Sequence, residues 1–159
     1  MSISLFELFK IGVGPSSSHT VGPMVAARRF GVWLTASGKL NATRAVRVDL
    51  YGSLALTGKG HATDTAVILG LCGHEPASVD IEAVPGILER VASERAVDLA
   101  GTHRAAFDPA TDLLFHQRKR QPFHSNAMAI TALDSAGQIV ATRLYYSIGG
   151  GFVLDEDEA

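Results

Sequence analysis

A polar segment bounded by glycine and proline constrains the start of this 159-residue chain. Residues 12–24 read Gly-Val-Gly-Pro-Ser-Ser-Ser-His-Thr-Val-Gly-Pro-Met, and a largely apolar run of helical length follows. Glycine and proline mark a loop, so the serines lie just before a helix start, which Ser18 or Thr20 would cap. Pro23 then falls in the first helical turn, where its missing N–H has no partner to lose. The pattern predicts a helix over about residues 20–36.

The same helix start is a candidate anion site. Backbone N–H groups, the hydroxyls of Ser16, Ser17 and Ser18, and the positive end of the helix dipole converge there, which suits a carboxylate or phosphate. His19 adds a group that can move a proton near neutral pH. A capped helix with a solvated polar entrance is the simpler interpretation of the spacing alone, because capping is commoner than anion binding. The residues by themselves leave both interpretations open.

Composition and charge indicate one globular domain. Apolar residues make up 47% of the chain and charged residues 19%, which excludes disorder. The net charge of −2, from 14 basic and 16 acidic residues, argues against a general nucleic-acid binder. Apolar stretches are interrupted before about 18 residues, and the N-terminus has no signal-peptide pattern. We therefore expect a cytoplasmic protein that binds neither nucleic acid nor membrane.

The single cysteine, Cys72, limits the metal chemistry of the chain. It can form no internal disulfide, and alone it cannot hold an iron–sulfur cluster, which takes about four thiolates. Its apolar helical context predicts a small buried hydrophobe. No two of the six histidines have the close i, i+4 spacing of a helical zinc motif, so the sequence gives weak support to a self-contained metal site.

Hydrophobic periodicity predicts an α/β (α+β) fold, a sandwich of helices on a mixed or antiparallel sheet. The expected strands are residues 45–51, 112–116, 126–133 and 139–147, the last two forming a hairpin. The expected helices are a turn or two at residues 3–10 and longer helices at residues 20–36, 62–72 and 85–99. Past Leu154 the chain is acidic with nothing to bury, which predicts a linker or tail over residues 155–159.

Four segments spread along the chain carry a family resemblance. They are residues 5–24, residues 51–61 (Tyr-Gly-Ser-Leu-Ala-Leu-Thr-Gly-Lys-Gly-His), residues 124–128 and residues 146–153. In this order they closely resemble the N-terminal, or beta, domain of the iron–sulfur-dependent L-serine dehydratases. The chain departs from that pattern at Ala62 and Ser125, where the family has glycine and proline.

The resemblance implies a reaction in which L-serine loses water and the resulting enamine becomes pyruvate and ammonia, without a pyridoxal cofactor. It implies a 4Fe–4S cluster that acts as a Lewis acid on the hydroxyl while a base takes the α-proton. The cluster's cysteines lie in a second, alpha, domain that this chain lacks. The implied fold is similar to the allosteric substrate-binding domain of some D-3-phosphoglycerate dehydrogenases, which supports a homodimer.

This chain would then supply half of an active site, and the alpha domain would supply the other half. Residues 1–154 would form the beta domain and residues 155–159 an acidic linker toward the alpha domain, which belongs either to a separate subunit or to the same longer chain. We expect the isolated beta domain to be inactive.

Residue roles follow as hypotheses. The substrate carboxylate would bind to Ser16, Ser17, Ser18, Thr20 and the helix start behind them, with Asn126 as a further hydrogen-bond donor. His61 is the first choice for the base that takes the α-proton. His124 and His19 are the alternatives, for proton transfer or orientation, and the choice among the three needs distances.

Two other function classes remain open. One is a regulatory module that binds serine or another small acid and catalyses nothing. The other, ranked last, is an independent zinc or iron hydrolase that uses the three histidines. The preference for serine over threonine is also open.

Overall fold

The structure is a computed structural model that describes residues 17–58, 62–117, 126–149 and 152–158. The helical turn predicted at residues 3–10 lies outside these ranges. The described helices are the π-helical turn η1 (Ser17–Val21), α2 (Gly22–Ala36), α3 (Ser53–Gly58), α4 (Thr63–Leu71), the 3-10 turn η2 (Ile81–Ala83) and α5 (Val84–Glu94). The described strands are β1 (Ala45–Gly52), β2 (Ala96–Leu99), β3 (His103–Ala106), β4 (Leu113–His116), β5 (Asn126–Leu133), β6 (Ile139–Gly149) and β7 (Phe152–Asp155).

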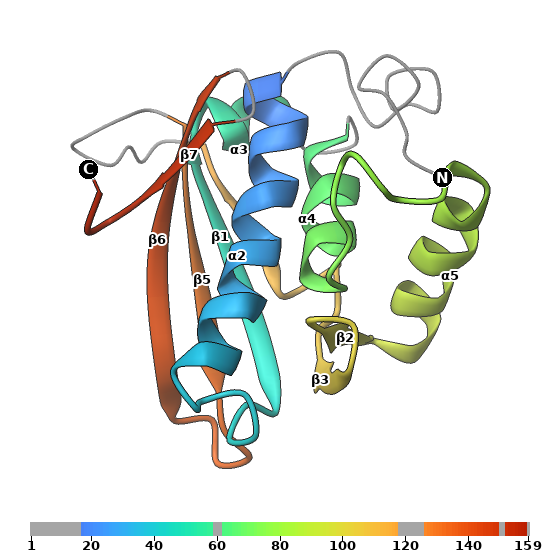
Figure 1. Cartoon of the computed structure of the whole chain (residues 1–159), viewed down its shortest axis with the longest axis vertical. Coiled ribbons are helices and arrows are strands. Elements are labelled where there is room, and N and C mark those ends of the chain that lie inside the picture. The colour runs from blue at the N-terminus through green and yellow to red at the C-terminus, as the bar shows by residue number, and fades with distance from the viewer. Residues whose placement is uncertain (1–16, 59–61, 118–125, 150–151, 159) are drawn as a thin grey trace.

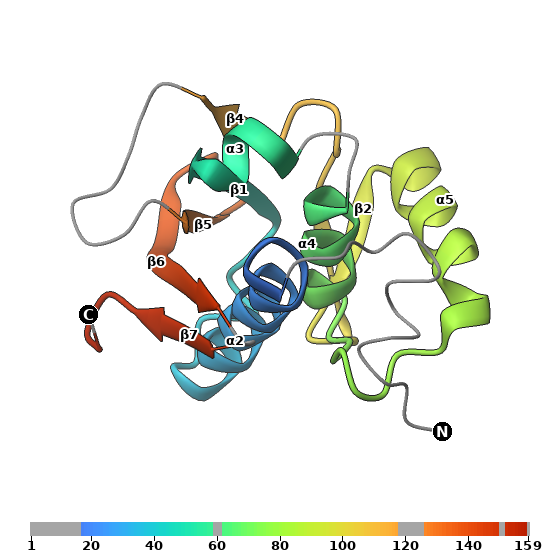
Figure 2. The ribbon, with the colours of Figure 1, turned by 90° about the horizontal axis from the view of Figure 1, so that it is seen from above.

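The described strands form one seven-stranded mixed sheet, in the order β2-β3-β1-β5-β6-β7, with β4 also paired to β1. Strand β1 is parallel to β3 and β4 and antiparallel to β5, and β5, β6 and β7 form an antiparallel meander. Helices α2 and α4 cover one face of the sheet, and α5 lies beyond α4 (Figures 1 and 2). The predicted fold class is therefore confirmed, whereas the similarity to D-3-phosphoglycerate dehydrogenase stays a prediction.

The core lies between α2, α4 and the sheet. The period-two pattern of β1 buries Val46, Val48 and Leu50 on the helix side, as the alternation predicted. These side chains belong to one hydrophobic cluster with Phe30 and Leu34 of α2. Burial of these apolar side chains supplies the main favourable term for folding.

The two central helices touch closely at Gly70. A β-carbon built there would lie 2.7 Å from Cβ of Ala27 and would clash with the backbone oxygen of Met24, both on α2. Only glycine therefore allows this approach of α4 to α2.

The prediction that the third long helix runs to about residue 99 is wrong. Helix α5 ends at Glu94, because Arg95 adopts a left-handed conformation (φ +53°), and residues 96–99 form β2. Strand β2 buries Val97 and Leu99 alternately with Asp98, which is the strand pattern. Leu99 pairs with His103, so the turn between β2 and β3 has three residues, and two of them, Ala100 and Gly101, have positive φ values of +54° and +79°.

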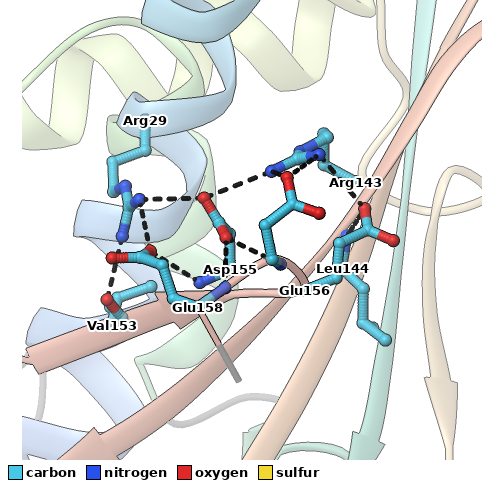
Figure 3. Close-up of polar contacts among 8 residues, drawn as sticks. Arg29, Arg143, Leu144, Val153, Asp155, Glu156 and Glu158 are labelled. Carbon is cyan, nitrogen blue, oxygen red and sulfur yellow. Dashed lines mark hydrogen bonds and ion pairs between the residues drawn. The ribbon is translucent and has the colours of Figure 1, made fainter.

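Strand β7 and the acidic turn after it, residues 156–158, pack against α2 and β6 (Figure 3). Arg29 donates to the backbone oxygen of Val153 (2.8 Å) and pairs with Asp155 (3.2 Å) and Glu158 (2.8 Å). Arg143 pairs with Asp155 at 3.2 Å. Strand β7 and the partners of these carboxylates were not predicted from the sequence. We call this cluster of Arg29, Arg143 and their carboxylates the C-terminal clasp.

Arg143 is the more enclosed arginine of the clasp. Its side chain is 13% exposed, and its guanidinium lies 5.0 Å from the centre of the Trp33 ring. It also pairs with Glu156 (3.6 Å) and Asp157 (3.2 Å).

The carboxylate of Glu158 in the clasp is stabilised in its charged form. Its pKa is lowered by a hydrogen bond from the backbone N–H of Asp155 and by Arg29. The contribution of Glu158 to stability is therefore present above the ordinary glutamate pKa and is lost as pH falls through the lowered value.

No helix within the described ranges combines the length and apolar character needed to cross a membrane.

We predict that Gly70→Ala lowers the free energy of unfolding by about 2–3 kcal/mol, because the new methyl group clashes with α2. Urea unfolding of the two proteins measures the difference. The matched control is Gly86→Ala on α5, where a β-carbon would meet no atom within 4 Å. That variant should be equal to the parent or up to about 0.5 kcal/mol more stable. Equal stabilities for Gly70→Ala and the parent would contradict the close helix contact.

We predict that Arg143→Gln lowers the free energy of unfolding by about 1–3 kcal/mol, between the values for exposed and buried ion pairs. The loss should shrink as pH falls below the ordinary carboxylate pKa values, because the carboxylates then no longer need the cation. Arg104→Gln is the control, since Arg104 is half exposed and pairs with Glu94 and Asp98. It should cost clearly less than Arg143→Gln, because exposed ion pairs contribute little to stability. Equal losses for the two variants would show that the clasp is only a surface feature.

Candidate functional site

The ends of several strands meet at one edge of the sheet, which we call the site edge. Because β4 and β6 run in the same direction as β1, all three end there, and β5 and β7 begin there. The turn η1 before α2 and the helix α3 after β1 lie at the same end of the domain (Figure 1). Three predicted site residues are described at this edge with their side chains: His19 and Thr20 in η1, and Asn126 at the start of β5.

The start of α2 differs from the prediction. No side chain caps α2, and Val21, the residue before it, is itself helical (φ −63°, ψ −46°). The predicted cap by Ser18 or Thr20 is therefore wrong, because residues 17–21 already form the turn η1 and the helical path begins at Ser17. Pro23 lies in the first turn of α2, as predicted.

The turn η1 is attached to the start of α4. The hydroxyl of Thr63 donates to the backbone oxygen of His19 at 2.6 Å, and Thr63 is only 2% exposed. Thr20 is buried as well. A buried hydrogen bond between two helix starts holds their first turns side by side. His61 precedes this α4 start by two residues.

Asn126 is held by two contacts with the residues that follow β1. Its backbone pairs with Gly52, and its side-chain oxygen Oδ1 accepts a hydrogen bond from the hydroxyl of Ser53. Gly52 has φ +59°, which turns the chain from β1 into α3 and suits glycine. Ser53 was not predicted as a site residue, although it lies in a segment that carries the family resemblance.

A second polar cluster at this edge was also missed. Nε2 of His116, the last residue of β4, lies 2.7 Å from Oδ1 of Asp49, and Asp49 is 6% exposed. The rings of His116 and Tyr51 stack with centroids 4.9 Å apart. The pKa of Tyr51 is raised, mainly by burial and to a smaller extent by the charge of Asp49. Its hydroxyl therefore stays protonated at neutral pH. No local sequence signal joins Asp49 to His116, which are 67 residues apart.

The remaining predicted residues cannot be placed in the same way. Ser16, His61 and His124 lie outside the described residues. For Ser17 and Ser18 the structure gives the helical backbone of η1 alone. Their roles therefore stay predictions.

The described residues do not form a recognisable metal site. Within the described ranges, no group of three or more His, Cys, Asp or Glu side chains could hold a metal ion. Cys72 is half-buried at the end of α4, and burial raises the pKa of its thiol. It lines a pocket with His74, Arg90 and Asp98, at the end of α4 away from η1. The thiol is therefore protonated at neutral pH and is a poor metal ligand.

Comparison with known proteins identifies the family. The model of the serine dehydratase beta chain family matches residues 4–158, and the chain belongs to this family. It is 50% identical to an L-serine dehydratase of Streptomyces coelicolor over 99% of its own length. It is 49% identical to L-serine dehydratase 1 of Escherichia coli over 98% of its length, and 43% identical to an L-serine dehydratase of Helicobacter pylori over 99%. The chain spans about a third (34%) of each of these relatives.

Proposed function

We propose that this chain supplies the substrate-binding and proton-transfer residues of an enzyme that converts L-serine to pyruvate and ammonia. The observation that carries the proposal is the match of nearly the whole chain to relatives named L-serine dehydratase. The chain would act with an alpha domain or subunit that carries a 4Fe–4S cluster. Without that partner it would be inactive.

The carboxylate of L-serine is proposed to bind at the start of η1. Hydroxyl groups of Ser16, Ser17 and Ser18 and the N–H groups of the first helical turn would surround it. Thr20, which is buried in η1, would contribute a further donor to the same carboxylate. Asn126 would add a further donor from the start of β5. The position of η1 and Asn126 at one edge of the domain supports this arrangement.

The proton-transfer groups are proposed to be His61, as the base that takes the α-proton, with His124 and His19 for transfer or orientation. A base must come within hydrogen-bond reach of the proton that it removes. His61 lies two residues before Thr63, and His124 two residues before Asn126. Both described neighbours are at the site edge, which supports a shared site for the three histidines and the bound substrate.

The iron–sulfur cluster does not fit this chain as a resident group. The whole sequence has one cysteine, whereas such a cluster takes about four thiolates. Cys72 also lies at the opposite end of α4 from η1. The proposal therefore assigns the cluster to the partner and to this chain the binding of the carboxylate and the movement of protons.

We predict that the chain releases no pyruvate from L-serine alone and releases it when combined with a cysteine-bearing alpha domain under anaerobic conditions. We propose as this alpha domain the part of the Streptomyces relative that this chain does not span. A coupled assay for pyruvate measures turnover. No turnover in the combined sample, together with L-serine binding to the chain by calorimetry, would favour the regulatory module. Stoichiometric zinc or iron in the purified chain would favour the hydrolase.

We predict that His61→Ala abolishes turnover of the combined enzyme while the cluster remains intact, because the α-proton then has no base. The visible absorption of the cluster and pyruvate release are measured on the same sample. His74→Ala is the control, since His74 lies near the far end of α4. It should retain turnover. Turnover like that of the parent in His61→Ala would refute the assignment of the base.

A further inference from the structure

His116 is fixed from two sides at the site edge. It ends β4, and in the parallel ladder it pairs with Tyr51 of β1. Its Nε2 lies 2.7 Å from Oδ1 of Asp49, and its ring stacks on that of Tyr51 with an interplanar angle of 14°. A hydrogen bond in the ring plane and a stack on the ring face together restrict both the position and the rotation of an imidazole.

The buried carboxylate of Asp49 needs His116 as a hydrogen-bond partner. A carboxylate that is 6% exposed must be matched by hydrogen-bond donors, because removing one partner from a buried charge is costly. Asp49 interacts with His116 and, at 3.3 Å, with Nε of Arg47 on its own strand. The contact with His116 is the one that joins two strands. It therefore ties the end of β4 to β1 at Asp49, and the stack of His116 on Tyr51 extends this contact to the residue directly before Gly52.

The end of β1 is in turn the part of the chain that holds Asn126. Gly52, directly after Tyr51, pairs with the backbone of Asn126, and Ser53 donates to its side-chain oxygen. Because Oδ1 accepts from Ser53, the amide nitrogen Nδ2 is the end of Asn126 that can donate to a carboxylate. A displacement at the end of β1 would move this donor.

We propose that His116 is a positioning residue for Asn126. By bonding to Asp49 and stacking on Tyr51, it fixes the end of β1 and thereby the orientation of the Asn126 amide. This inference rests on the proposed function, in which Asn126 binds the carboxylate of L-serine. Neither His116 nor Asp49 has to touch the substrate for this role.

The experiment is a double-mutant cycle in the combined enzyme. His116→Gln should raise KM for L-serine about tenfold, the scale of one hydrogen bond to a charged group, with a smaller effect on kcat. In an Asn126→Ala background the same substitution should leave KM unchanged, because the group that it positions is gone. An equal rise of KM in both backgrounds, or no rise in either, would overturn the proposal. Asp49→Asn, which keeps the shape of the side chain, should follow the same pattern if His116→Gln does not fold.

The control is His103→Gln. His103 also makes a 2.7 Å contact through Nε2, to the backbone oxygen of Thr43, but it lies near the start of β1 at the opposite edge of the sheet. It should leave KM unchanged in both backgrounds.

A second readout does not depend on turnover. In the NMR spectrum of this chain, His116→Gln should shift the side-chain amide signals of Asn126, and His103→Gln should not. Unshifted Asn126 signals in His116→Gln would contradict the positioning role even if the combined enzyme proved inactive. Absence of turnover in the parent enzyme, with the Asn126 signals shifted, would contradict only the proposed function.

Discussion

The pairing of β1 with strands in both directions determines where the site edge lies. Its parallel pairing with β4 and antiparallel pairing with β5 place the end of β1, the end of β4 and the start of β5 together. Gly52 then lets the chain leave the sheet into α3 at that point. Residues that are far apart in the sequence therefore become neighbours through backbone hydrogen bonds before any side-chain chemistry is considered.

Packing on the helix face completes this edge. The contact of Gly70 with α2 sets the distance between α2 and α4, and the bond from Thr63 to His19 joins their first turns. The C-terminal clasp holds β7, the last strand in the sheet order, against α2. Each contact keeps the starts of both helices close to the ends of the central strands, which is the arrangement that the proposed function needs.

Most regular elements of the fold could be predicted from the sequence because their patterns are local. The alternation of Val46, Val48 and Leu50 identified β1, and the hairpin of β5 and β6 followed from two apolar runs with a glycine turn. The end of α5 was misplaced because charged residues up to Arg95 continue a plausible helical surface, and only the left-handed backbone at Arg95 ends it.

The unpredicted parts of the candidate site and of the C-terminal clasp depend on contacts between distant residues. Asp49 and His116 are 67 residues apart, and Arg29 and Asp155 are 126 apart. No periodicity relates such residues, since their approach follows from the order of the strands. Polar residues around glycine turns, such as those at 12–24, could be identified because they cluster in the sequence itself.

In the proposed enzyme, this chain presents the site edge to a partner that carries the metal. Hydrogen exchange measured by mass spectrometry, on this chain alone and in complex with the alpha domain, tests it most directly. We expect increased protection in the complex for peptides that cover η1, the Ser53 segment, the start of α4 and the start of β5. Protection confined to α5 and the hairpin of β2 and β3, with these peptides unchanged, would contradict it.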